Sequence, residues 1–370
     1  MPKTPTQEDL RNLLQTRPEP CISIFLPLPR HGADLAAAPL RYRALLREAE
    51  GLLSDRYDPR RVKELLAPLA GLAEAGDVLG RGPGGLAAFR AEGLFETYRI
   101  WPEPPERAVV ADSFHLKPFL RCLQDRDRWF VVALGARQAS LWEGSGPGLA
   151  PRPLPPLRAP APPARGAAPR GGRGAGPGKA PEEGDGSRRE EALRFCRAVD
   201  GVLREILDPD AVLLVAGPPH LAALFREACG HRGLAEDAVE GAFDDARAEE
   251  LFARALPVAE KALAARDHAL VDDFRRQLDR SLAADVLTRV AEASVAGRVR
   301  RLLVADGRPL FGRVDRTTGE VTLHAGQTGP QDDDVLDDLA EIVLARGGEV
   351  VVLPPGRMPD EAAAVATFRW

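Results

Sequence analysis

The sequence predicts an α/β protein of two or three domains. Its 370 residues are 44% hydrophobic and 28% charged, the composition of a chain long enough to bury more than one core. Strand-like and helix-like hydrophobic patterns alternate in a second block, residues 127–250, and in a third block, residues 251–370, as is typical of α/β domains. A Pro- and Gly-rich stretch interrupts the middle block. We expect domains at 1–126, 127–250 and 251–370, with a mobile basic loop at 145–187.

The first block predicts helices around one buried strand. Thr6 and Asp9 form a capping pattern ahead of apolar residues at helical spacing. Residues 21–26 are β-branched or apolar and end at a proline, as in a buried strand. Leucines recur every three or four residues over 40–53 and 60–72, which predicts two helices. The residues beyond them, 86–100, are predicted to be extended.

The second block predicts the order β-β-loop-α-β-α. Residues 129–134 and 139–142 flank Gly135 and are expected to form a hairpin. After the loop, 188–206 carries one apolar helical face, and the strand 211–215 turns at Gly217 into another helix.

The third block begins with a long helical region. We expect it to extend over 248–295, with breaks at Pro257 and near 265–267. A strand at 302–304, a helix at 335–345 and a strand at 349–353 follow. This block is therefore again predicted to be α/β.

Charge and cysteine content exclude several classes of protein. Lys plus Arg is 50 and Asp plus Glu is 55, so no strongly basic body indicates a nucleic-acid partner. The four cysteines have no metal or redox spacing and are expected to be free thiols. We find no apolar run of membrane-spanning length and no signal-peptide pattern. These features predict a cytoplasmic protein with neither a membrane nor a DNA partner.

Two glycine motifs do not fit the chemistry they would serve. Residues 80–85 match the G-x-G-x-x-G spacing of dinucleotide-binding turns, but a strand-like segment follows where a helix is needed. Gly178-Lys179 lacks the earlier glycine and the following hydroxyl residue of a phosphate-binding loop. The six histidines show no metal-ligand spacing. We therefore expect no cofactor and no metal.

One glycine motif remains as a functional candidate. It lies in residues 145–181, which hold eleven Pro, eight Gly, six cations and no acid. Adjacent glycines allow positive φ and present bare N–H groups to a carbonyl or a phosphate, and cations without counter-charge favour a polyanion. A disordered low-complexity insertion is the alternative explanation of this composition. The candidate residues are Gly171, Gly172, Arg173 and Gly174.

The chain resembles the bacterial branch of the archaeo-eukaryotic peptide-chain release factors, relatives of class-1 release factors and Pelota. The similarity extends over nearly the whole sequence, and the order of its segments is more specific than any one of them. The segments that carry it are 20–27, 112–118, 194–200, 297–304, 347–354, 358–359 and 366–370.

The resemblance implies a tRNA-shaped protein of three domains. These are an N-terminal α/β domain, an RNase H-like middle domain, and a C-terminal α/β/α domain similar to an RNA-binding ribosomal-protein fold. In the terminating members a Gly-Gly-Gln loop on the middle domain reaches the peptidyl-transferase centre and helps to place water against the peptidyl-tRNA ester. Gly171-Gly172-Arg173 stands where that loop is expected. The strand 131–134 has no carboxylate, so a two-metal nuclease is not expected.

The resemblance leaves two functions open. One is peptide release or rescue of stalled ribosomes through this loop. The alternative is a non-catalytic ribosome-binding or stress factor, which the replacement of Gln by Arg173 supports. Partners are then the ribosome, with its RNA and peptidyl-tRNA, and a translational GTPase. The cations expected to contact RNA phosphates are Arg165, Arg170, Lys179, Arg188 and Arg189.

Two further groups of residues have alternative roles. Phe114, His115 and Lys117 are candidates either for RNA contact or for packing between domains, and packing is the favoured one. The acidic residues within 332–338 are expected to cap the helix that starts at Val335 and to occupy its first turn.

Overall fold

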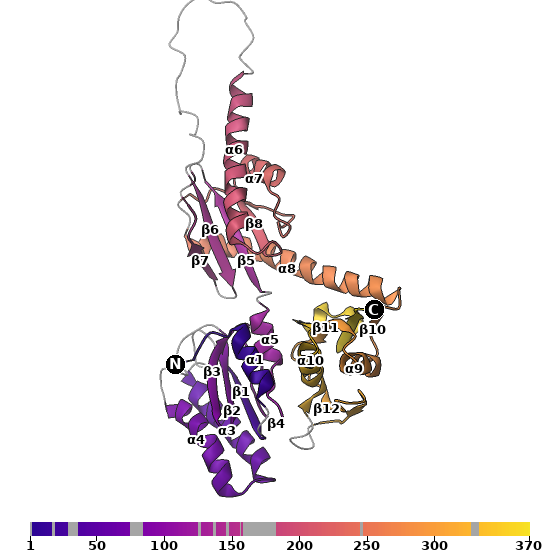
Figure 1. The fold of residues 1–370 in the computed structure, drawn as a ribbon. Helices are drawn as coiled ribbons and strands as arrows, with labels where there is room; N and C mark the ends of the chain where they lie inside the picture. The colour runs from indigo at the N-terminus through magenta and orange to yellow at the C-terminus, as the bar shows by residue number, and fades with distance from the viewer. Residues whose placement is uncertain are drawn as a thin grey trace, which may run out of the picture. The chain divides into compact units, whose positions relative to one another are not determined.

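The structure is a computed structural model that describes residues 2–16, 19–28, 36–74, 84–124, 127–135, 138–145, 148–155, 157, 183–244, 247–326 and 333–370. The chain divides into two compact units. Unit 1 combines residues 1–126 with residues 266–370, and unit 2 comprises residues 127–265. Figure 1 labels their elements. Both units combine sheets with helices, which confirms the predicted α/β class.

The N-terminal segment of unit 1 is built on an antiparallel sheet with the order β3-β2-β1-β4. Its elements are α1 (Gln7–Gln15), β1 (Cys21–Pro27), α3 (Ala38–Ser54), α4 (Pro59–Glu74), β2 (Gly85–Ala91), β3 (Leu94–Ile100), β4 (Arg107–Ala111) and α5 (Lys117–Leu123). The predicted capping box is confirmed: Asp9 N–H donates to Thr6 Oγ1 at 3.1 Å, and Thr6 N–H donates to Asp9 Oδ2 at 3.0 Å. Strand β1 is buried on both faces, because Phe25 and Ile24 enter two different apolar clusters.

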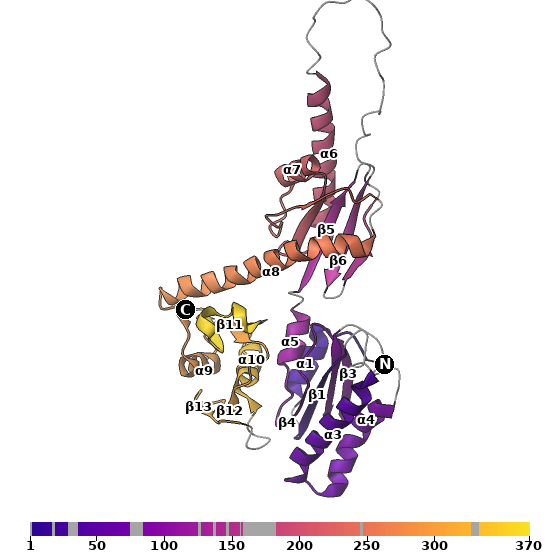
Figure 2. The same ribbon diagram turned by 180° about the vertical axis from the view of Figure 1, so that it is seen from behind.

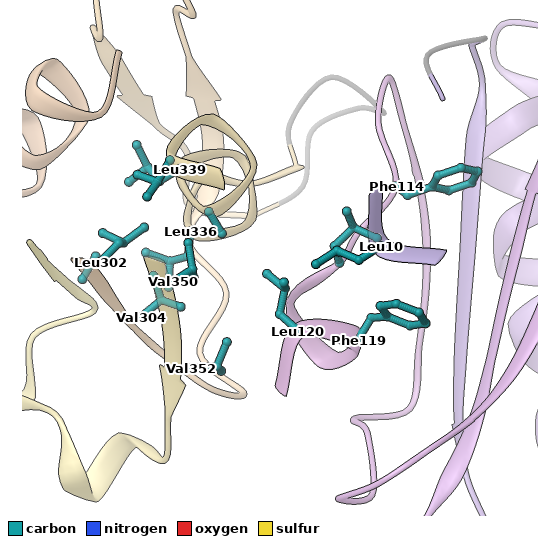
Figure 3. Packing of buried hydrophobic residues seen from close by; sticks show 14 of the residues in the cluster. Leu10, Phe114, Phe119, Leu120, Leu302, Val304, Leu336, Leu339, Val350 and Val352 are labelled. Atoms are coloured by element: carbon teal, nitrogen blue, oxygen red, sulfur yellow. The ribbon is translucent and has the colours of Figure 1, made fainter. Parts of the chain in front are cut away.

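The C-terminal segment of unit 1 contains two sheets, with the orders β10-β16-β11-β15 and β13-β12-β14. Its elements after α8 (Ala248–Leu278) are β10 (Ala283–Ala284), α9 (Leu287–Val295), β11 (Val299–Ala305), β12 (Phe311–Val314), β13 (Val321–Leu323), β14 (Asp333–Asp334), α10 (Val335–Ala345), β15 (Glu349–Leu353), β16 (Ala364–Phe368) and two short 3-10 helices, η1 (Pro355–Arg357) and η2 (Pro359–Glu361). One apolar cluster includes residues of both segments. Figure 3 shows Leu120 of α5 beside Leu336 and Val352 of the C-terminal segment. The two ends of the chain therefore share a core.

Unit 2 has one five-stranded sheet with the order β7-β6-β5-β8-β9. Its elements are β5 (Arg128–Leu134), β6 (Ala139–Ser145), β7 (Gly148–Arg152), α6 (Glu183–Ile206), β8 (Val212–Gly217), α7 (Pro219–Ala228), β9 (Val239–Glu240) and the first part of α8 (Ala248–Leu278). The predicted hairpin is confirmed, with Leu134 opposite Ala139. Helices α6 and α7 cover one face of the sheet, and α8 covers the other, as Figure 2 shows.

The predicted breaks in the long helix are wrong. Helix α8 runs without interruption from Ala248 to Leu278 and contains Pro257 in its interior. Proline removes one backbone hydrogen bond from a helix, but buried side chains on both sides of Pro257, such as Ala255 and Ala259, hold this stretch against the sheet. Packing therefore outweighs the local cost of the proline.

None of the four cysteines, all of them among the described residues, forms a disulfide. Among the described helices, none combines the length and the apolar character that crossing a membrane requires.

Candidate functional site

Most of the residues predicted to form the site lie outside the described residues. These are Gly171, Gly172, Arg173, Gly174, Arg165, Arg170 and Lys179. The structure describes the two elements on either side of them, β7, which ends at Arg152, and α6, which begins at Glu183. Arg188 and Arg189 are the two predicted RNA contacts that the structure places, and both are exposed on α6.

At the end of β7, Arg152 has an acidic partner. Its Nε lies 3.0 Å from Glu143 Oε2 on β6, and Arg128 of β5 lies 3.4 Å from the other oxygen of Glu143. One carboxylate thus joins cations from the two neighbouring strands. The sequence counted Arg152 among cations without counter-charge, and the structure corrects that count.

Helix α6 presents its arginines on the face opposite its core. Phe195, Cys196 and Val199 are buried against the sheet, as their spacing predicted. Arg189 pairs with Glu227 of α7 at 2.7 Å, with both side chains more than half exposed, so solvent weakens this pair. Arg188 is exposed and forms no ion pair with any described residue.

The segment around Cys229 and His231 is structural. Asp200 of α6 is buried and accepts the N–H of Gly230 at 3.1 Å, and Arg204 pairs with it at 2.8 Å. Burial raises the pKa of the Cys229 thiol to about 11, so the thiol stays protonated. The His231 ring Nε2 lies 2.7 Å from the carbonyl of Ala211. Across the described ranges, no cluster of three His, Cys, Asp or Glu side chains is arranged to hold a metal ion.

Phe114, His115 and Lys117 belong to the interior of unit 1. Their exposed fractions are 0%, 1% and 3%, so they pack between segments and an RNA contact through them is wrong. The Lys117 ammonium pairs with Asp334, which is equally buried. Burial, followed by the charges of Lys117 and Arg107, lowers the pKa of His115 well below its usual value. These residues stabilise unit 1 instead of forming an external site.

Asp337 caps a helix from the opposite end of the chain. Helix α5 starts after Leu116, whose side chain cannot accept a hydrogen bond from the helix. Asp337 of α10 takes that role, since its Oδ1 accepts the N–H of Leu116 at 2.8 Å and that of Lys117 at 2.5 Å. Asp334 caps α10 as predicted, by accepting the N–H of Leu336 at 3.2 Å. Asp337 lies in the first turn of α10, as predicted, but its carboxylate caps α5. The sequence places more carboxylates near Val335 than one helix end needs, and this excess was the available signal that one of them caps another helix.

Arg316 joins two further carboxylates of α10. Its Nη2 lies 2.9 Å from both Asp338 Oδ1 and Glu341 Oε2. The pKa of Asp338 is raised to about 7, mainly by burial; Arg316 opposes this shift, and the charges of Glu341 and Asp112 add to it. Lys117, Asp334, Asp337 and Glu341 form a buried charged cluster in which both segments of unit 1 take part, and the exposed Arg316 lies at its edge.

Comparison with known proteins gives a match over unit 2 and the start of the C-terminal segment. Residues 128–298 match the family described as bacterial archaeo-eukaryotic release factor family 3. Over these residues the chain is similar to the bacterial archaeo-eukaryotic release factors. This match confirms the resemblance inferred from the sequence. The matched segment contains β7 and α6, the two elements that flank the glycine motif.

Alignments with solved structures have low identities and TM-scores below 0.5. An archaeal translation termination factor, aRF1, aligns with 98% of this chain and 96% of its own at 17% identity and a TM-score of 0.28. Pelota of Archaeoglobus fulgidus aligns over 77% and 79% at 15% identity and a TM-score of 0.33. Dom34 of S. cerevisiae, a translation termination-like factor, aligns over 73% and 75% at 10% identity and a TM-score of 0.43. No curated protein matches the chain.

Proposed function

We propose that this protein is a ribosome-associated translation factor that releases peptides from stalled ribosomes or rescues them. The family match over residues 128–298 carries the proposal, because that segment includes Gly171-Gly172-Arg173. Among proteins of similar fold, Dom34 is described as involved in RNA quality control pathways and as interacting with Hbs1, and archaeal Pelota as ribosome-bound together with ABCE1. For this chain we propose ribosomal RNA and peptidyl-tRNA as contacts, a translational GTPase as a partner, and the cytoplasm as location.

We propose further that unit 2 is an RNase H-like middle domain. Strands β5, β6 and β7 form an antiparallel meander, β8 runs parallel to β5, and β9 runs parallel to β8. A mixed sheet of this order with helices on both faces supports the assignment. The C-terminal segment, in which β11 and β15 are parallel, is proposed as the ribosomal-protein-like domain. Because α8 is continuous, we place the boundary between these domains inside it, at the division between residues 265 and 266, instead of at residue 250.

The proposed chemistry belongs to the glycine motif. Gly171, Gly172 and Gly174 have no side chains, so their N–H groups are free to approach the ester carbonyl and to stabilise the developing oxyanion. Arg173 would stand beside the attacking water. Arg165, Arg170, Lys179, Arg188 and Arg189 would hold RNA phosphates and so position the motif.

The second candidate is a ribosome-binding or stress factor without catalysis. The observation that favours it is Arg173, since a long and permanently charged guanidinium replaces the Gln of the terminating relatives. In this role the loop would be a tether that holds the factor on RNA.

Ribosome binding tests the shared part of both candidates. Purified protein is sedimented with ribosomes over a salt series, beside a form that lacks residues 159–181. We expect binding that weakens as salt rises and that depends on this segment. If neither empty, tRNA-loaded nor stalled ribosomes bind the protein, the proposed function is wrong.

Peptide release from stalled complexes separates the two candidates. In a catalytic loop, Gly171→Ala with Gly172→Ala should abolish release while binding persists, because the added Cβ atoms block close approach. Gly166→Ala with Gly176→Ala, in the same stretch, is the matched control and should leave release intact. Arg173→Gln should raise release. A tether would tolerate all three changes, and no form of the protein would release peptide.

A further inference from the structure

Three arginines gather where two helices of unit 1 end. Arg298 follows the end of α9, Arg346 caps the end of α10, and Arg369 follows β16. The backbone N–H of Arg369 donates to the carbonyl of Arg298 at 2.8 Å. The Arg369 guanidinium donates to the carbonyl of Arg346 at 3.0 Å. The three residues therefore form one surface, which we call the arginine ridge.

Acidic side chains do not neutralise the ridge. All three arginines are exposed, and none forms an ion pair with a described residue. Their neighbours differ, because Arg300 pairs with Asp273 at 2.8 Å and Arg301 pairs with Glu349 at 2.7 Å. The ends of α9 and α10 favour nearby cations through their carbonyl groups. That preference explains where the arginines lie, but one carbonyl uses only one of the five donors of a guanidinium.

Aromatic side chains adjoin the ridge. The guanidinium of Arg298 lies over the ring of Phe368, 5.0 Å from its centroid. Trp370 is 65% exposed, the most exposed of the large hydrophobic side chains in the described part of the chain. Phe368 is half-buried, so Trp370 supplies the exposed ring. An exposed aromatic ring near unpaired cations suits single-stranded RNA, since a base stacks on the ring and phosphates bind the cations.

A hollow beside the ridge is less suited to binding a phosphate than the ridge itself. It has a volume of about 400 Å³ and is lined by Arg346, Arg316, Glu292, Thr317 and Thr318, among others. Arg316 is already held by two carboxylates there. Glu292 adds a negative charge that would repel an anion. The exposed ridge is thus the better phosphate site.

We propose that the arginine ridge, together with Phe368 and Trp370, is a second RNA-binding surface, which contacts the backbone and one unstacked base of a single-stranded RNA segment. It lies in the C-terminal segment, apart in sequence from the glycine motif. The proposal rests on the proposed function only in taking this RNA to be ribosomal. Binding to RNA alone can therefore be tested without the ribosome.

The test measures binding of the full-length protein to a short single-stranded RNA by fluorescence anisotropy over a salt series. The variant combines Arg298→Gln, Arg346→Gln and Arg369→Gln. Each phosphate contact contributes about 0.7 to the slope of log affinity against log salt. We expect the slope to fall by about 2 and the affinity to drop on the order of tenfold or more at about 0.1 M salt.

Matched variants separate charge, stacking and folding. Replacing the paired arginines Arg275, Arg276 and Arg300 by Gln removes equal charge from the same segment and should leave the slope nearly unchanged. Trp370→Ala should weaken binding several-fold with the slope intact, because stacking does not release counterions. Arg→Lys at the three ridge positions keeps the charge and should restore most of the slope. If the Gln variant fails to fold, this Lys variant still tests whether charge at the ridge determines the slope.

Two outcomes would overturn the proposal. In the first, ridge and control variants bind RNA equally well. In the second, the ridge variant loses affinity for a poly-glutamate peptide but not for RNA, which would assign the surface to an acidic protein. Co-sedimentation with ribosomes keeps the two proposals apart. If the unmodified protein does not bind ribosomes but the ridge variant still loses RNA binding, the proposed function fails and the ridge stands.

Discussion

Lys117 in unit 1 and Lys261 in unit 2 each pair with an aspartate, in opposite surroundings. The pair of Lys117 with Asp334 is buried, with side chains 3% and 0% exposed. The pair of Lys261 with Asp237 spans 2.6 Å, with side chains 65% and 50% exposed. The buried pair joins residues 217 positions apart, whereas the exposed one joins residues 24 apart. Unit 1 thus buries an ion pair where its two segments meet, whereas the compared ion pair of unit 2 stays in contact with water.

The difference reflects how each unit is assembled. Unit 2 is one continuous stretch of chain, and apolar clusters cover both faces of its sheet. Unit 1 must bring two distant segments together. An apolar contact alone specifies this docking poorly, whereas a buried carboxylate that needs particular donors permits few alternatives. We infer that the buried charged cluster selects how the two segments of unit 1 pack.

The largest effect is expected from Lys117→Met. It leaves the buried carboxylate of Asp334 without its counter-charge, which should lower the free energy of unfolding of unit 1 by about 3–5 kcal/mol. Lys261→Met is the matched control in unit 2 and should cost less than about 1 kcal/mol, because water screens that pair. Hydrogen exchange should show lost protection in both α5 and α10 and unchanged protection in unit 2. Equal effects of the two variants would contradict the comparison.

Asp337→Ala should have the next largest effect, about 3 kcal/mol. It removes a charged acceptor from the N–H groups of Leu116 and Lys117 and leaves them buried. Asp337→Asn keeps one acceptor oxygen and should lose about half as much. Thr6→Ala, which removes the local cap of α1, is the comparison variant, with an expected cost of about 1 kcal/mol. Denaturant unfolding measures all three, and a neutral Asp337→Ala would show that the cap from α10 is dispensable.

Asp338→Asn should change how stability depends on pH. The pKa of Asp338 is raised from 3.8 to about 7 in the folded state, so folded unit 1 holds a proton that the unfolded chain releases within this range. The contribution of Asp338 is therefore present at low pH and is lost as pH rises from about 4 to about 7. The variant should lack this decline.

The measurement is the difference in unfolding free energy between the unmodified protein and Asp338→Asn at each pH. His115 acts in the opposite direction, because its lowered pKa keeps it neutral in the fold while the unfolded chain gains a proton below about 6.5. His115→Gln should therefore reduce the loss of stability on acidification. A pH-independent difference between the unmodified protein and Asp338→Asn would show that Asp338 titrates normally.

The smallest effect on stability is expected from Arg189→Gln. Its pair with Glu227 is more than half exposed, so the free energy of unfolding should change by less than about 0.5 kcal/mol. Ribosome binding should nevertheless weaken, with a shallower salt dependence, if this arginine contacts RNA. Arg60→Gln, which breaks the exposed pair with Glu64, is the control and should affect neither property. Unchanged co-sedimentation of Arg189→Gln would remove Arg189 from the proposed contacts.

Much of the fold was predictable from local patterns. The capping box of Thr6 and Asp9, the buried strand after Pro20, the hairpin around Gly135 and the helix that starts at Val335 were all expected and are confirmed. The small sheet of β12, β13 and β14 was not expected, because strands of two to four residues leave too short an alternation to detect. For the candidate site, the exposure of Arg188 and Arg189 is now known, and the role of the glycine motif stays a prediction.

The sequence by itself determined most of the longer helices and strands and their apolar faces, because these depend on residues within a few positions of one another. It also contained the family resemblance that the match over residues 128–298 confirms. Only the tertiary structure decided that Asp337 caps α5, that Lys117 is buried against Asp334, and that α8 continues through Pro257. Each of these depends on which distant groups packing brings together. Several carboxylates lie near Val335, and their order along the chain does not say which of them will meet a given helix end or ammonium group.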